Sequence, residues 1–150
     1  MQWFNIYLPK VIVDFCNSNA MVEINNLTNS SVDKEFLKRV AKKVLKRENT
    51  KEIDLSIVLV GQERMRKLNK KYRRSDKVTD VLSFGDGLNE IVICLREVKK
   101  NAKKYHTNFK KELARILIHG ILHLLGEDHE KSKTEARRME KKQDYYLSKV

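Results

Sequence analysis

Three of the four histidines of this chain lie close together, as His119, His123 and His129. Residues four apart sit one turn apart on the same side of an α-helix, so His119 and His123 can face one ion. An unbroken helix would carry His129 roughly 15 Å beyond His119, at about 1.5 Å per residue, whereas zinc–nitrogen bonds are about 2.0–2.1 Å. Gly126 solves this, because glycine just past a helix end can turn the chain back. The spacing predicts a metal site with three histidine ligands.

The helix expected to carry His119 and His123 is apolar on nearly all sides, and such a helix is normally buried. Two histidines on a buried helix are often only hydrogen-bonded core residues, but the third one behind Gly126 favours metal binding. No fourth ligand is evident, which is typical of catalytic zinc sites with an open position. The apolar positions are Leu113, Leu117, Gly120 and Leu124 in one stripe, with Ile118, Ile121, Leu122 and Leu125 beside it.

Two segments together resemble the YbeY family of bacterial metal-dependent endoribonucleases that act in ribosomal RNA maturation. One is His119–His129; the other is Leu68–Phe84, where Leu-Asn-x-x-Tyr-Arg leads into Thr-Asp-Val-Leu-Ser-Phe. The resemblance extends over about residues 21–148 and does not include residues 1–20. Three places depart from the usual family residues, namely Val78 for proline, Glu127 for tyrosine and Asn89-Glu90 for Gly-Asp.

The resemblance implies an α+β domain with a mixed sheet of about four strands and a buried, zincin-like central histidine helix. It also implies a zinc-dependent endoribonuclease, specific for single strands, that acts in small-subunit ribosomal RNA 3′-end maturation and ribosome quality control. The implied partners are single-stranded RNA and the ribosome or its small subunit. Arg73 matches the arginine of the family's Tyr-Arg motif, which makes it the candidate catalytic arginine.

The composition is compatible with one domain over residues 1–150, because 41% apolar residues can build a self-sufficient core at this length. Cys16 and Cys94 lie far apart without metal-ligand spacing, which favours free thiols in a reducing compartment. The chain has no apolar run of about 18 residues that could span a bilayer, and the apolar start is broken by Pro9 and lacks a basic leader. We therefore expect a cytoplasmic protein with no membrane partner.

The net charge of +12 and the pI near 9.7 favour a polyanionic partner. Many of the Lys and Arg clusters have helical spacing opposite apolar residues, so solvated helix faces are the alternative interpretation. The cluster over residues 64–74 is the best candidate for RNA contact, because Tyr72 within it can stack on a base. The candidate contacts are Lys70, Lys71, Tyr72 and Arg74.

Periodicity predicts the order of helices and strands. Strands are expected at 21–24, 54–60, 79–84 and 90–94, with a turn at Gly85-Asp86-Gly87. Helices are expected at about 62–71, 96–105 and 109–125. Capping boxes predict two more helices, one starting at Ser30-x-x-Asp33 and reaching about Glu48, and one starting at Ser132-x-x-Glu135 and running toward Ser148.

Zinc with an open position lowers the pKa of a bound water to about 7, so hydrolysis is the predicted reaction class. Gly120 argues against a His-Glu-x-x-His peptidase, whose second residue is the general base. Asp128, Glu127 and Asp80 remain candidates for a base, although Asp128 is better explained as orienting an imidazole. The guanidinium of Arg73 can donate two parallel hydrogen bonds to the oxygens of a phosphate group.

Three further polar residues receive minor roles in this interpretation. Thr79 and Ser83 are expected to fix the backbone near the site, and His106 to lie at the surface. A different class of function remains open, a zinc-stabilised RNA-binding or ribosome-assembly factor without significant catalysis. Other divalent metals than zinc also suit imidazole ligands.

Overall fold

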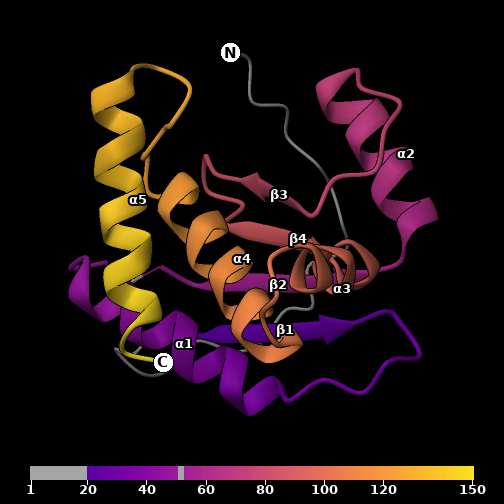
Figure 1. The fold of residues 1–150 in the computed structure, drawn as a ribbon, viewed down its shortest axis with the longest axis horizontal. Helices are drawn as coiled ribbons and strands as arrows, with labels where there is room; N and C mark the ends of the chain where they lie inside the picture. Colours follow the sequence, from indigo (N-terminus) through magenta and orange to yellow (C-terminus); the bar gives the residue numbers. More distant parts are fainter. Residues whose placement is uncertain (1–19, 51–52) are drawn as a thin grey trace.

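The computed structural model describes residues 20–50 and 53–150, in which four strands form a single sheet in the order β1-β2-β4-β3 (Figure 1). β1, β2 and β4 run parallel, and β3 pairs antiparallel with β4. This mixed sheet with its surrounding helices confirms the predicted α+β class. The strands are β1 (Val22–Asn26), β2 (Leu55–Val60), β3 (Val81–Phe84) and β4 (Glu90–Cys94), and the helices are α1 (Lys34–Arg47), α2 (Gln62–Arg73), α3 (Leu95–Lys104), α4 (Phe109–Leu124) and α5 (Lys133–Leu147).

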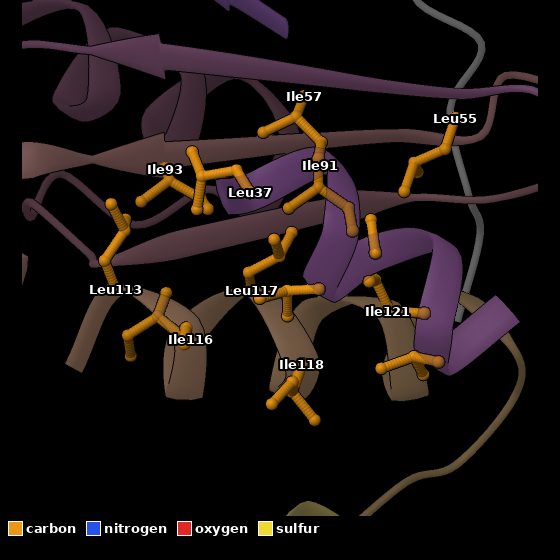
Figure 2. Close-up of a cluster of buried hydrophobic side chains, with 14 of the residues drawn as sticks. Leu37, Leu55, Ile57, Ile91, Ile93, Leu113, Ile116, Leu117, Ile118 and Ile121 are labelled. Carbon is orange, nitrogen blue, oxygen red and sulfur yellow. The ribbon is translucent and has the colours of Figure 1, made fainter. Parts of the chain in front are cut away.

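The two faces of the sheet carry separate apolar clusters. The larger cluster joins the strands to α1 and α4, and Figure 2 shows Ile57 and Ile91 of the sheet pointing toward Leu117 of α4. The smaller cluster places Met65 of α2 against strand residues such as Val92. α3 and α5 pack against α4, so α4 is enclosed on several sides as its sequence predicts. In the described part of the chain, no helix has the length and apolar character needed to cross a membrane.

Gly120 allows α4 to approach the sheet closely. A Cβ atom at this position would lie 3.0 Å from the Ile91 side chain, 3.2 Å from Val81 and 3.3 Å from Ser83. The Ser83 hydroxyl donates a hydrogen bond of 2.9 Å to the Gly120 carbonyl oxygen, which ties β3 to the middle of the histidine helix. The residue that argues against a His-Glu-x-x-His peptidase is therefore also required by packing.

We expect Gly120→Ala to destabilise the protein although alanine is the better helix former. Overpacking a close contact costs about 1–3 kcal/mol, whereas the helix-propensity gain is about 1 kcal/mol. The free energy of unfolding, measured with urea, should fall by roughly 1 kcal/mol. Gly85→Ala is the control, because its nearest neighbour would lie 4.0 Å away. Equal effects of the two substitutions would contradict this account.

The first helix begins later than predicted. α1 starts at Lys34, and Asp33 is its N-cap, accepting the backbone N–H of Phe36 at 2.9 Å. Ser30 does not cap the helix, because it belongs to a hydrogen-bonded turn: its N–H bonds to Thr28 and its carbonyl to Asn26. A single cap at Asp33 therefore replaces the capping box predicted to start at Ser30.

The last helix begins where its capping box predicts. Ser132 is the N-cap of α5, and its hydroxyl oxygen accepts the backbone N–H of Glu135 at 3.1 Å. The helix then runs to Leu147, close to the predicted end at Ser148. This cap fixes where α5 starts after the loop that carries His129.

Candidate metal centre

The three histidines of the predicted site lie together at the C-terminal part of α4. His119 and His123 come from the helix, and His129 comes from the loop that follows it. The ring centres are 4.7 Å apart for His119 and His123, and 4.8 Å apart for His123 and His129. One nitrogen from each ring lies within 4.8 Å of the other two. The arrangement can hold one ion between three imidazoles.

Gly126 turns the chain as its sequence position predicts. Its φ of 93° is in the left-handed region, where a side chain is strained. The Gly126 N–H bonds to the His123 carbonyl and the Glu127 N–H to the Leu122 carbonyl, both at 3.0 Å. These two bonds form a Schellman motif, which ends α4 and points the following residues back along it. His129 reaches the helical histidines for this reason.

Gln143 of α5 fixes the orientation of the His119 ring. Its carbonyl oxygen Oε1 lies 2.9 Å from His119 Nδ1. Because a carbonyl oxygen only accepts, Nδ1 carries the hydrogen and Nε2 keeps its lone pair for an ion. A hydrogen bond of this kind commonly orients metal-binding histidines. Sequence reasoning missed Gln143, since no spacing rule connects it to a histidine 24 residues earlier.

The two helical histidines are held neutral. Burial lowers the pKa of His119, and burial together with the neighbouring histidines lowers the pKa of His123 to about 4. A metal ion binds the neutral form of imidazole, so no proton has to leave these rings at neutral pH. Neutral nitrogen ligands with an oriented His119 ring fit a zinc ion.

We expect the metal-free protein to lose stability as the pH falls from 6.5 to about 4. The unfolded chain protonates His123 below its usual pKa of 6.5, while the folded chain resists until about 4, so the unfolded state binds more protons in this window. The shift corresponds to roughly 3 kcal/mol at most, and solvent at the site reduces it. His123→Gln should flatten the urea stability profile in the presence of a chelator, whereas His106→Asn should not. An unchanged profile in His123→Gln would contradict this origin.

Arg73 is the last residue of α2. Its positive charge contributes to lowering the pKa of His123, which places the guanidinium within electrostatic reach of the site. Arg74 caps the helix with a φ of 54° and ends α2 directly after Arg73. The buried Asn69 holds the loop that follows, because its side chain donates to the Lys77 carbonyl at 2.8 Å. The end of α2 that carries Arg73 is therefore fixed in place.

The other α2 candidates have partners of their own. Lys70 pairs with Asp76 at 3.2 Å, and the Lys71 ammonium lies 5.1 Å from the centre of the Tyr72 ring. The half-buried Tyr72 ring meets Phe84 edge to face at 5.5 Å. Of these residues, Lys70, Lys71 and Arg74 remain exposed on the surface of α2.

The candidate carboxylates differ in what they contact. The Asp128 carboxylate accepts a hydrogen bond of 2.9 Å from the Glu130 N–H, and this bond forms a turn in the loop that carries His129. The negative charge of Asp128 acts to raise the pKa of His123. Glu127 is buried, and its carboxylate accepts a hydrogen bond of 2.6 Å from the Lys142 ammonium. Asp80 accepts the Asn101 amide at 3.0 Å and acts electrostatically on His119.

Three remaining sequence candidates lie outside the histidine cluster. Cys94 is buried on the α2 side of the sheet, and burial raises the pKa of its thiol. His106 is exposed in the loop after α3. Thr79 donates to Asp80 at 3.5 Å. Cys16 and the apolar N-terminal segment lie outside the described residues.

Comparison with known proteins gives one consistent result. The family model described as Endoribonuclease YbeY matches residues 21–150. The chain belongs to the YbeY family. It is 37% identical to the endoribonuclease YbeY of Sulfurihydrogenibium sp. over 88% of this chain and 93% of the relative. It is 48% identical to that of Thermodesulfovibrio yellowstonii over 63% of this chain and 65% of the relative.

A solved structure also resembles the fold. The solution structure of a Thermotoga maritima protein matches with a TM-score of 0.65 and 34% identity, covering 85% of this chain and 87% of that one. At this coverage, the similarity extends over most of the YbeY domain rather than over one motif.

Three of the four residues that depart from the usual YbeY pattern have local explanations, whereas Glu90 is buried and its Oε1 has no hydrogen-bond partner among the described residues. Asn89 has a φ of 48°, a conformation that glycine adopts freely and asparagine tolerates best among other residues. Glu127 joins a network in which Lys142 also binds Glu48 at 2.9 Å, and Tyr146 donates to the same Glu48. This network connects the loop that carries His129 to α5 and to the C-terminal end of α1. Val78 packs half-buried against the smaller apolar cluster.

Proposed function

We propose that this protein is a zinc-dependent endoribonuclease that cleaves single-stranded RNA. The observation that carries the proposal is the convergence of His119, His123 and His129 within electrostatic reach of Arg73, in a chain whose relatives are named endoribonuclease YbeY. A net charge of +12 supports an RNA substrate.

The histidines would hold one zinc ion through three imidazole nitrogens. When bound, the ion would activate water and withdraw charge from a phosphate oxygen. Gln143 keeps the His119 ring in the tautomer that presents Nε2. We assign Asp128 a positioning role rather than proton transfer, because its carboxylate shapes the loop of His129. Glu127 anchors the same loop through Lys142.

Arg73 is the proposed catalytic side chain of the polypeptide. Phosphodiester cleavage develops negative charge on the non-bridging oxygens, and a guanidinium can donate two parallel hydrogen bonds to them. The exposed residues Lys70, Lys71 and Arg74 on the same helix would attract the RNA backbone. Tyr72 would contribute through the exposed part of its ring.

We further propose that the substrate is ribosomal RNA, with action at the 3′ end of the small-subunit RNA and in ribosome quality control. The ribosome or its small subunit would then be the partner, and the cytoplasm the place of action. Membership of the YbeY family supports these proposals.

The experiment uses a single-stranded RNA from the 3′ region of small-subunit ribosomal RNA, and the same strand annealed to its complement. The zinc-loaded protein should cut the single strand internally and leave the duplex largely intact. The product ends identify the attacking group. A water that displaces the 3′ oxygen leaves a 5′-phosphate and a 3′-hydroxyl, whereas attack by the 2′-hydroxyl displaces the 5′ oxygen and leaves a 2′,3′-cyclic phosphate and a 5′-hydroxyl. RNA binding without any cleavage would instead favour an assembly factor.

The assembly-factor alternative makes a separate prediction about folding. If the metal were structural, its removal should unfold the domain. None of the three histidines belongs to the buried apolar cluster between the sheet, α1 and α4. We therefore expect the circular dichroism spectrum at neutral pH to survive chelation while cleavage is lost.

A further inference from the structure

A hollow lies on the histidine helix, between the C-terminal ends of α3 and α5 and the N-terminal half of α4. Its volume is about 340 Å³. None of its lining residues belongs to the candidate metal ligands. They are Tyr105, Thr107, Lys111, Glu112, Arg115 and Leu147, and we call this site the Tyr105 hollow.

Arg115 is held rigidly in the hollow. Glu112 is buried, with 2% of its surface exposed. Its carboxylate accepts two hydrogen bonds from the Arg115 guanidinium, one from Nε at 2.9 Å and one from Nη2 at 2.5 Å. The hydrogens on Nη1 have no hydrogen-bond partner within residues 20–50 and 53–150. The Arg115 side chain is 29% exposed, so this remaining edge is available to a ligand. A fixed guanidinium with a free edge suits a phosphate oxygen.

Tyr105 offers an aromatic surface next to this cation. It is 56% exposed, the highest value among the large apolar side chains of the described residues. The Arg115 guanidinium carbon lies 5.8 Å from the ring centre, and Lys104 Nζ lies 5.2 Å from it. Tyr105 caps α3, and the backbone bond from Thr107 N–H to the Ala102 carbonyl at 3.0 Å closes that cap. The ring therefore projects from a fixed turn.

The hollow and the metal centre share one side of α4. Lys111, Arg115 and His119 follow one another at intervals of four residues, which places them on one side of the helix, about 6 Å apart along its axis. The positive charge of Arg115 acts to lower the pKa of His119. The negative charge of Asp80 acts to raise the pKa of both Arg115 and His119. Arg115 and Glu112 form an ion pair without net charge, so the positive charge around the hollow comes from the nearby exposed residues Lys104 and Lys111.

We propose that the Tyr105 hollow binds a second nucleotide of the same single-stranded RNA, away from the bond that is cut. Arg115 holds its phosphate, and Tyr105 stacks on its base. Single-strand binding sites combine a basic groove with aromatic rings in this way. The proposal rests on the proposed function. It adds a second binding site, which determines the length of RNA strand that the protein contacts.

The test compares Tyr105→Ser with wild type on two single-stranded RNAs, one long enough to span both sites and one that covers only the metal centre. Loss of one stacked base should raise KM for the long RNA roughly 5- to 100-fold, with kcat unchanged. The short RNA should be cut equally well by both proteins. Tyr105→Trp should restore the KM for the long RNA, because it restores an aromatic face.

Tyr145→Ser is the matched control. Tyr145 is also exposed and lies 4.8 Å from the guanidinium of Arg47, but it is not part of the hollow. It should leave both KM values unchanged. If Tyr105→Ser leaves the KM for the long RNA unchanged, or raises both KM values equally, the proposal is overturned and the hollow is left for another partner.

Direct binding separates this proposal from the proposed function. Fluorescence anisotropy measures the affinity of each protein for the long RNA without cleavage. A wild type that binds but does not cut, with binding weakened by Tyr105→Ser, would reject the endoribonuclease and keep the hollow. A wild type that cuts, with binding unaffected by Tyr105→Ser, would reject the hollow and keep the endoribonuclease.

Discussion

His129→Ala is expected to abolish RNA cleavage without unfolding the protein. The third ligand comes from an exposed loop, so its loss removes no core packing. An ion that acts as a Lewis acid contributes several kcal/mol to the transition state, and at about 1.36 kcal/mol per factor of ten this corresponds to roughly a 1000-fold loss of rate. Substituting a residue that only hydrogen-bonds to a metal ligand lowers metal affinity about 10- to 100-fold. Loss of a ligand itself should therefore lower zinc affinity at least about 100-fold.

Cleavage rate, zinc content and thermal unfolding of the His129→Ala protein together check this expectation. His106→Asn is the control, because His106 is exposed, lies outside the cluster, and has a φ of 52° that asparagine tolerates. It should behave as wild type in all three measurements. A His129→Ala protein that cuts RNA at the wild-type rate would remove His129 from the site.

Arg73→Ala is expected to lower kcat by about 100- to 1000-fold, the loss seen when one preorganised donor to a developing oxyanion is removed. The guanidinium lies within electrostatic reach of His123, yet it belongs to the exposed end of α2, so the fold and the zinc content should not change. Arg73→Lys should recover only part of the rate, because an ammonium offers a point charge and not a planar pair of donors.

The control for Arg73 is Arg39→Ala on α1, which removes the same charge from another exposed helix position. Single-turnover cleavage with saturating protein separates the chemical step from RNA binding. We expect Arg39→Ala to leave the rate constant unchanged. If both variants slow cleavage equally, net charge rather than Arg73 accounts for the effect.

Local rules predict most of the fold because the chain signals its turns and caps clearly. The apolar run at 90–94 predicts β4 at its observed bounds, and α4 ends at the Schellman turn that Gly126 requires. The predicted start of α1 is wrong, since Ser30 and Asp33 are both good caps and only the contacts of Ser30 with Asn26 and Thr28 decide between them. Sequence position alone does not contain those contacts.

The ligand set of the candidate site is also readable from the sequence, because helix periodicity and one glycine fix the three histidines relative to one another. The supporting residues are not readable. Gln143 and Lys142 lie on α5, and they meet His119 and Glu127 only because α5 packs against α4. Glu112 orients the Arg115 guanidinium, and the Tyr105 ring lies beside it. The spacing of charged residues in the sequence does not predict this arrangement.

The most direct test is a zinc titration of metal-stripped protein, with the cleavage rate of an internally labelled single-stranded RNA as the readout. We predict almost no cleavage without metal, a rise with added zinc, and saturation at one ion per chain, with no rise at all for His129→Ala. A metal-stripped protein that cuts this RNA at the full rate would contradict the assignment of catalysis to the three-histidine centre.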